Sequence, residues 1–394
     1  MDHLADVFVA FLRLGLTSFG GPVAHLGYFN AEFVRRRKWL DDETFAHIVA
    51  LAQTLPGPAS SQVAIVIGLQ RAGLAGAAAA WIAFTIPSAI LLTLFALGVG
   101  RVAGFESSGW IHGLLLAAVA VVALAVANMF RTLCPDVPRR VFAVAAAIAI
   151  LFLPPHPLAQ LGLIAAGAAF GAFFLRTDGQ SPQPLQIPIP RSVAAACAIV
   201  FAALLVGLPP LARIAHGSVL DAFSAFYESG ALVFGGGHVV LPLLDARVVG
   251  PGWISAQTFL AGYGAAQAVP GPLFTFASYL GAAMHGPMTG IGGAAIALFA
   301  IYLPSFLLIA AVLPFWNQLV ASARVLSALR GINAAVVGLL LAALYSPVMT
   351  NAIHAPADVA IALLAFTLLA AGKAAPWSVV AFCALVGELL SRVR

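Results

Sequence analysis

Two short segments place polar side chains around a proline–glycine–proline triplet inside otherwise apolar stretches. Proline lacks a backbone N–H and clashes with the preceding turn, so each triplet ends one helix. Since proline is tolerated at the first helical position, Pro58 and Pro272 are expected to begin new helices. The apolar runs 43–55 and 59–71 are too short to cross a bilayer separately and are typical of re-entrant segments. The residues of interest are Gln53, Pro56, Gly57, Pro58, Ser60 and Ser61 in the first segment, and Gln267, Pro270, Gly271, Pro272 and Thr275 in the second.

Oxyanion binding is the chemistry that such a break can perform. The first N–H groups of a helix have no partner within it, and its N-terminus carries roughly half a positive charge. The helix after Pro58 is therefore a candidate anion site, where the hydroxyls of Ser60 and Ser61 add donors. Gln53 and Gln267 either bind substrate or satisfy the broken backbone. The alternative is that both breaks are packing kinks of membrane helices.

Two glycine turns offer further helix starts. Gly20-Gly21-Pro22 follows the first apolar run. Gly235-Gly236-Gly237 follows the run from about residue 220, where the pattern of the first run starts again. Glycine lets a backbone approach a ligand closely. The candidate substrate-binding residues of these turns are Gly20, Gly21, Pro22, Gly236 and Gly237.

Four ionisable residues lie in or beside apolar segments, where such residues are costly and are functional candidates by default. Arg13 lies inside the first apolar run, so we expect it to bind the anion; the alternative is snorkelling or an ion pair. His25, His238 and Glu228 are candidates for proton coupling, and the alternative for each histidine is a structural role at a helix start.

The composition predicts a polytopic membrane protein. Of 394 residues, 62% are hydrophobic and 8% are charged, and the mean hydropathy is +1.02, whereas a soluble domain carries roughly 25% charged residues. In such a chain the net charge of +5 reports loop topology rather than nucleic-acid binding. Three scattered cysteines support neither a disulfide framework nor a zinc site. The sequence contains no nucleotide loop, metal-ligand spacing or catalytic triad, so we expect no enzyme, metal or cofactor.

The elements that must position these residues occur twice. The turn at 19–22 is echoed at 234–237, Trp39 at Trp253, and Pro56-Gly57-Pro58 at 270–272. A repeat of this length predicts two similar helical bundles about a pseudo-two-fold axis. The expected fold is all-α, with a first membrane repeat over 1–176, a linker with an extra apolar helix over 177–219, and a second membrane repeat over 220–394.

The basic residues predict that the two repeats are inverted. Arg35–Lys38 and Arg131, Arg139 and Arg140 lie in the first half, whereas the matching stretches 249–253 and 349–358 hold no lysine or arginine. Because positive loops stay in the cytoplasm, equivalent loops are expected on opposite sides. Inverted repeats need an odd number of membrane crossings between equivalent points. Counting every long apolar run and one re-entrant element gives an even number. Either a short run does not cross or the broken element crosses once.

At these residues the chain resembles a known family. The run Phe19-Gly-Gly-Pro-Val-Ala-His25 with Trp39, followed by Gln53-Thr-Leu-Pro-Gly-Pro-Ala-Ser60, is similar to the chromate ion transporter (CHR) family. The runs 234–242 and 262–272 resemble the second-half signatures of its long, two-domain members. The resemblance covers about 8–130 and 221–347. It implies a multi-pass protein of the bacterial inner membrane, a secondary transporter that exports chromate from the cytoplasm and confers chromate resistance.

The resemblance leaves several alternatives open. Chromate is a tetrahedral dianion, which agrees with the oxyanion chemistry of the helix starts, but sulfate has the same shape and charge. A sulfate or other oxyanion carrier, an anion channel and a membrane-embedded enzyme are the other readings, and no acid, base or metal constellation supports the last. The expected partners are chromate, with sulfate as a second ligand, and the lipid bilayer, without nucleic acid. Whether the chain forms a homodimer stays open.

Overall fold

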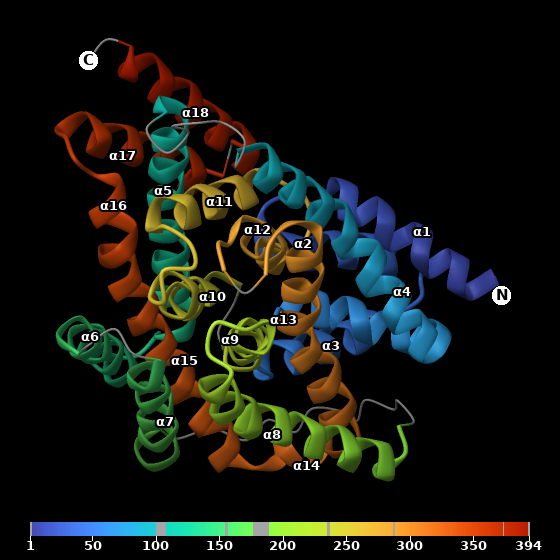
Figure 1. Ribbon diagram of the computed structural model, residues 1–394. Helices are drawn as coiled ribbons and strands as arrows, with labels where there is room; N and C mark the ends of the chain where they lie inside the picture. Colours follow the sequence, from blue (N-terminus) through green and yellow to red (C-terminus); the bar gives the residue numbers. More distant parts are fainter. Residues whose placement is uncertain are drawn as a thin grey trace.

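The computed structural model describes residues 2–99, 108–153, 157–175, 189–234, 237–286, 288–372 and 374–392. Over these residues the chain is helical and contains no strand, as Figure 1 shows, which confirms the predicted all-α class. Gly236 and most of the proline-rich part of the predicted linker lie outside the described residues.

Helices and short helical turns make up both halves of the described chain. The first half contains α1 (Asp2–Thr17), α2 (Gly21–Phe29), η1 (Asn30–Arg36), α3 (Asp42–Thr54), α4 (Ala59–Val99), α5 (Gly109–Leu133), α6 (Val137–Phe152) and α7 (Pro157–Phe174). After α8 (Arg191–Ile214), the second half contains α9 (Val219–Ala231), η3 (Gly237–Val239), α10 (Val240–Leu244), η4 (Asp245–Val249), α11 (Ala256–Ala268), η5 (Leu273–Thr275), α12 (Phe276–Ala283), α13 (Gly290–Val312), η6 (Leu313–Phe315), α14 (Trp316–Ala321), α15 (Ala323–Ala343), η7 (Leu344–Met349), α16 (Thr350–Ala352), α17 (Pro356–Ala370) and α18 (Pro376–Ser391).

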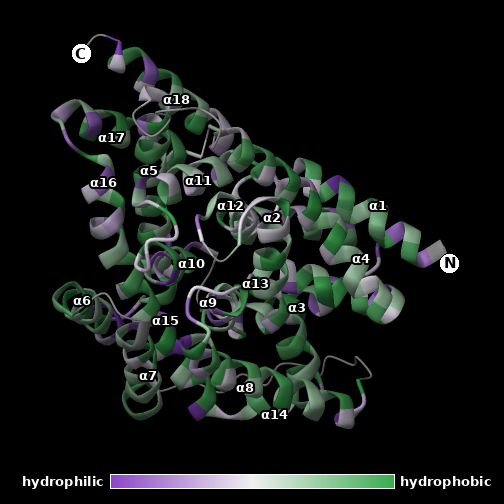
Figure 2. Cartoon of the chain, in the orientation of Figure 1, coloured by the Kyte–Doolittle hydropathy of each residue, from purple (hydrophilic) through white to green (hydrophobic). Residues whose placement is uncertain are grey.

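Five helical stretches within the described residues are long and apolar enough to cross a bilayer. Figure 2 shows these helices as largely hydrophobic along their length. They are Ala59–Gly98, Gly109–Leu133, Arg191–Ile214, Gly290–Phe315 and Ala323–Ala352. The first of them bends at Ala72 and Gly73, where the backbone leaves the helical conformation.

A proline–glycine–proline segment separates two helices in each half. α3 ends at Thr54 and α4 begins at Ala59, while α11 ends at Ala268 and a 3-10 turn begins at Leu273. Gly57 and Gly271 have φ angles of 125° and 102°, a backbone conformation that residues with a Cβ atom rarely adopt. The second half differs from the first because η5 precedes α12, so the element after Pro272 opens as a 3-10 helix and not as an α-helix.

Each half extends its last two helices onto the other half. α6 and α7 pack on α15, and α17 and α18 pack on α5. Glycines lie at these crossings: Gly171 meets Gly331, and Gly113 lies against Gly387. Small residues allow such close approach of helix backbones. α5 thus packs on α11, α15, α17 and α18 of the second half, and α15 packs on α5, α6 and α7 of the first half. Both helices contribute residues to the cavity described next.

Candidate functional site

A cavity of about 570 Å³ is lined by both halves of the chain. It brings together nine of the residues singled out in the sequence, namely Gly20, Gly21, Pro22, Gln53, Gly57, Gly237, His238, Gln267 and Gly271. The other lining residues are Leu26, Ala52, Leu55, Ala59, Val121, Leu124, Ala125, Asn128, Met129, Thr132, Leu133, Ala266, Val269, Leu273, Asn333, Leu369 and Pro376.

Four helix starts meet at this cavity. In the first half, α2 begins at Gly21 and α4 begins at Ala59. In the second half, the 3-10 turns that lead into α10 and α12 begin at Gly237 and Leu273. Because the first N–H groups of a helix point away from it without partners, these starts supply donors and positive potential. The site is thereby suited to an anion.

Two reciprocal backbone hydrogen bonds join the halves beside the cavity. The N–H of Gly57 donates to the carbonyl of Val233 at 2.6 Å, and the N–H of Gly271 donates to the carbonyl of Ser18 at 2.9 Å. Both glycines line the cavity. These two N–H groups are therefore used in joining the halves, and donors for a ligand must come from the helix starts and from side chains.

Uncharged polar side chains complete the lining. Gln53 is exposed, and Nε2 of Gln267 is buried without a hydrogen-bond partner in the described part of the chain. Asn128, Thr132 and Asn333 also line the cavity, and the sequence reasoning missed all three. The signal was present for two of them, since Asn128 and Thr132 are four residues apart and share one face of an apolar helix.

The described lining contains no lysine, arginine, aspartate or glutamate, and His238 is its one ionisable side chain. Nδ1 of His238 lies 2.6 Å from the hydroxyl of Tyr263, which is fully buried on α11. A lining with several donors and no carboxylate favours an anion over a cation, since a buried anion needs hydrogen bonds to replace its hydration.

Several predicted residues lie outside this lining. Ser60 and Ser61 are buried, and Oγ of Ser61 lies 3.5 Å from the hydroxyl of Tyr302. Thr275 is buried and donates to the carbonyl of Pro272 at 2.7 Å. These hydroxyls face the protein because the helices after the breaks turn that side into the core. Pro58, Pro270 and Pro272 are buried too, and Pro56 lines a second, apolar cavity of about 230 Å³.

The other ionisable candidates are also placed away from the cavity. Arg13 is exposed on α1, whereas Phe11 and Leu14 on the same helix are buried. His25 is fully buried, with Nε2 3.2 Å from the carbonyl oxygen of Ser18. Glu228 forms an ion pair with Arg247. Of the predicted titratable or charged candidates, the structure brings only His238 to the cavity.

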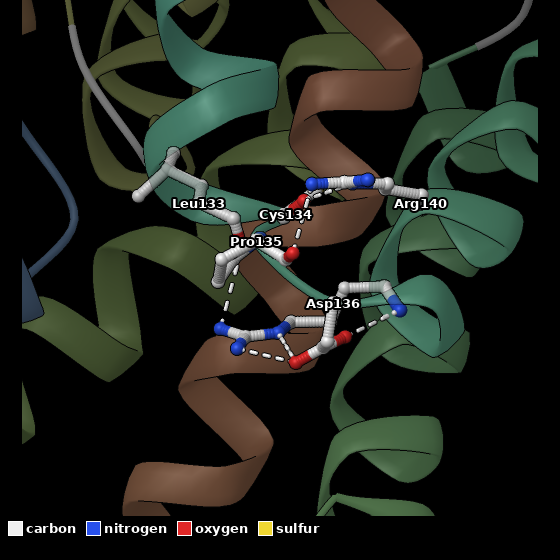
Figure 3. A network of polar contacts seen from close by, with 6 residues as sticks. Leu133, Cys134, Pro135, Asp136 and Arg140 are labelled. Carbon is white, nitrogen blue, oxygen red and sulfur yellow. Dashed lines mark hydrogen bonds and ion pairs between the residues drawn. The ribbon is translucent and has the colours of Figure 1, made fainter.

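The turn after α5 borders the cavity at Leu133 and is held by two arginines (Figure 3). Nε of Arg140 donates to the carbonyl of Cys134 at 3.0 Å, and Nε of Arg139 donates to Asp136 at 2.7 Å. The hydrogen bonds from Arg139 hold the pKa of the Asp136 carboxyl below its ordinary value. These guanidinium groups lie at the C-terminus of α5, where positive charge is favourable, so they stabilise one wall of the cavity.

Comparison with known proteins gives a consistent family. The family described as "Chromate transporter" matches residues 5–172 and 220–388. The chain is 28% identical to a chromate transport protein of Pseudomonas aeruginosa over 85% of its length and 79% of that protein. It is also 28% identical to a chromate transport protein of Cupriavidus metallidurans, covering 98% of this chain and 92% of the relative.

One further relative is similar to most of the chain. A probable chromate transport protein of Synechococcus elongatus is 25% identical over 83% of this chain and 80% of that protein. No solved structure matches the chain. Because the two family segments together cover most of the sequence, and apolar helices long enough to cross a bilayer run through it, the chain is a multi-pass membrane protein that belongs to the chromate transporter family.

Proposed function

We propose that this protein is a secondary transporter that exports chromate from the cytoplasm across the bacterial inner membrane and so confers chromate resistance. The observation that carries the proposal is the meeting of four helix starts from both halves at one cavity whose described lining holds no acidic side chain. Chromate is a tetrahedral dianion, so oxygens directed at different walls are each able to accept from a separate group of N–H donors. Sulfate shares this shape and charge and is the second candidate substrate.

The outward direction agrees with the electrical driving force. Moving one elementary charge across a membrane potential changes the free energy by about 2.3 kcal/mol per 100 mV, so the change for a dianion is about twice as large. An interior that is negative therefore expels chromate without any other energy source. Electrical driving alone accounts for export, and the candidate for any coupling to protons is His238, the one ionisable side chain of the described lining.

We also propose that the two membrane repeats, 1–176 and 220–394, are inverted relative to each other. Two observations support this. In Figure 1, α5 runs from the top of the view to the bottom, whereas its counterpart α15 starts near the bottom and runs upward. The reciprocal bonds of Gly57 and Gly271 also relate the halves by an approximate two-fold operation. An axis in the membrane plane reverses equivalent helices in this way.

Cysteine labelling tests the inversion. Glu43 and Gln257 occupy equivalent, exposed positions in the first turns of α3 and α11. In a background lacking Cys134, Cys197 and Cys383, we expect a membrane-impermeant thiol reagent added to whole cells to modify Gln257→Cys and not Glu43→Cys, because the basic cluster 35–38 keeps the first site in the cytoplasm. Modification of both from outside would mean parallel repeats.

Transport into inside-out vesicles tests the function itself. Export appears there as uptake, and we expect saturable chromate uptake that excess sulfate reduces if the two anions share the site. The double variant Gln53→Leu with Gln267→Leu removes two amides from the cavity. Losing hydrogen bonds to a charged ligand costs about 1.5–3 kcal/mol each, so the half-saturation concentration should rise about a hundredfold or more.

Gln257→Leu is the matched control, because this glutamine is exposed on α11 and does not line the cavity. It should leave the half-saturation concentration unchanged. A double cavity variant that behaves like this control would contradict the site. Uptake that rises linearly with chromate and never saturates would instead identify a channel.

A further inference from the structure

We propose that Nε2 of His238 is the side-chain donor that holds the anion in the cavity, and that Tyr263 positions it by fixing the imidazole tautomer. This role rests on the proposed function, since it needs an oxyanion in the cavity. His238 lies in η3, at the helix start that begins with Gly237, and both residues line the cavity. The imidazole is thus beside the backbone donors of the same turn.

The tautomer follows from the hydrogen bond with Tyr263. The hydroxyl of Tyr263 is buried, and its one partner in the described chain is Nδ1 of His238, at 2.6 Å. A buried hydroxyl proton requires an acceptor, so the hydroxyl donates and Nδ1 accepts. In a neutral imidazole whose Nδ1 accepts, the proton is on Nε2. The opposite edge of the ring therefore offers an N–H donor, the group that an oxyanion requires.

Tyr263 is held rigidly enough to enforce this choice. Its ring packs edge-to-face against Phe276, with centroids 5.7 Å apart, and Phe276 in turn stacks on Tyr279 at 6.0 Å. All three rings are fully buried. Because a packed aromatic ring cannot move its hydroxyl without displacing its neighbours, the donor is in place before the anion arrives.

The first half has no equivalent donor, so the site is asymmetric. In the repeated turns, Phe19 matches Phe234, which aligns Val23 with His238. The nearby His25 is fully buried, and its Nε2 lies 3.2 Å from the carbonyl oxygen of Ser18, away from the cavity lining. The two glutamines are contributed equally by both halves, whereas the imidazole is contributed by the second half alone. The anion should therefore be held closer to η3 than to α2.

Two substitutions at His238 separate its two nitrogens. The amide nitrogen of glutamine reaches about as far as Nε2, whereas that of asparagine reaches about as far as Nδ1. Chromate affinity is measured by equilibrium dialysis on the purified, monodisperse full chain. We expect His238→Asn to bind chromate roughly ten- to a hundredfold more weakly, the loss of one hydrogen bond to a charged ligand, and His238→Gln to remain within about threefold of the unmodified chain because it restores a donor at the same place.

A double-mutant cycle tests the positioning role of Tyr263. Tyr263→Phe should weaken binding about two- to tenfold in the unmodified chain, as for loss of a neutral hydrogen bond, and should cause no further weakening in His238→Asn. If Tyr263 were merely structural, it would weaken both backgrounds equally, and that result would overturn the positioning role. His285→Gln, at an exposed loop position, is the control for histidine loss and should bind normally.

The outcomes distinguish the role of His238 from the proposed transport function on which it rests. An unmodified chain that binds neither chromate nor sulfate overturns the proposed function. If the unmodified chain binds chromate and His238→Asn binds it at least as tightly as His238→Gln does, only the role of Nε2 is overturned.

Discussion

Gly57→Ala should abolish chromate transport and lower the yield of folded protein. Gly57 has a φ angle of 125°, which an alanine adopts only with strain. A Cβ atom there would also lie 2.5 Å from Nε2 of Gln62 and 2.6 Å from Oγ of Ser305, both buried. Gln62 cannot move aside freely, because its Nε2 donates to the carbonyl of Pro56 at 2.7 Å. Backbone strain and the broken hydrogen bonds together should cost about 3 kcal/mol.

One control glycine, Gly217, and the equivalent glycine of the second half, Gly271, separate the backbone cost from the effect on the cavity. Gly217 has a φ angle of 74° and nothing within 4 Å of an added Cβ atom, so Gly217→Ala should show the backbone cost alone, about 1–2 kcal/mol, with normal transport. Gly271→Ala should resemble Gly57→Ala, since its Cβ would lie 2.8 Å from Oγ of Ser88. Thermal unfolding measures the loss of stability, and vesicle uptake measures transport. Normal transport by Gly57→Ala would contradict a role for this segment in shaping the cavity.

The part of the site that local sequence specifies was predictable. Proline has a fixed backbone and no N–H, so the sequence alone places interruptions at Pro56 and Pro270. The repetition of the segment indicated that its two copies belong together, and Gln53 and Gln267 do line the same cavity. Neither inference needed knowledge of which helices pack together.

The direction in which each side chain points was not predictable by the same reasoning. Ser60 and Ser61 follow the break immediately, but the rotation of the new helix is set by packing on its neighbours, and it turns both residues into the core. Arg13 differs, because its own helix carried the signal. Asp6 and Arg13 are seven residues apart and share one exposed face of α1, opposite the buried Val7, Phe11 and Leu14.

The pairing of distant helices also could not be read from the sequence. Gly167 and Gly171 are four residues apart, as are Gly109 and Gly113, and this spacing predicts a close helix crossing. It does not identify the partner helix. The structure places Gly331 of α15 at the first crossing and Gly387 of α18 at the second, so the two halves exchange contacts that the repeat pattern alone would have kept within each half.

Arg247→Met should be among the most destabilising substitutions in this chain. One carboxylate oxygen of Glu228 forms an ion pair with Arg247, and the other accepts from Oγ of Ser224 at 2.7 Å. The Glu228 side chain is 8% exposed, compared with 25% for Arg247. Removing the guanidinium leaves a buried carboxylate without its counter-charge, which costs about 3–5 kcal/mol. The pair of Arg392, exposed just after the end of α18, with the half-buried Glu388 is the control, and Arg392→Met should cost less than about 0.5 kcal/mol.

Glu228→Gln separates a structural ion pair from a proton carrier. The amide keeps the size of the side chain and removes the charge, and Arg247 is exposed enough to remain hydrated, so this variant should lose less stability than Arg247→Met. Combining Glu228→Gln with Arg247→Met should recover most of the stability that Arg247→Met loses. If the pair is structural, transport per folded molecule and its dependence on pH should match those of the unmodified chain. A Glu228→Gln variant that folds fully and transports chromate at a rate no longer dependent on pH would instead make Glu228 the coupled proton site, because glutamine mimics a carboxyl that never releases its proton.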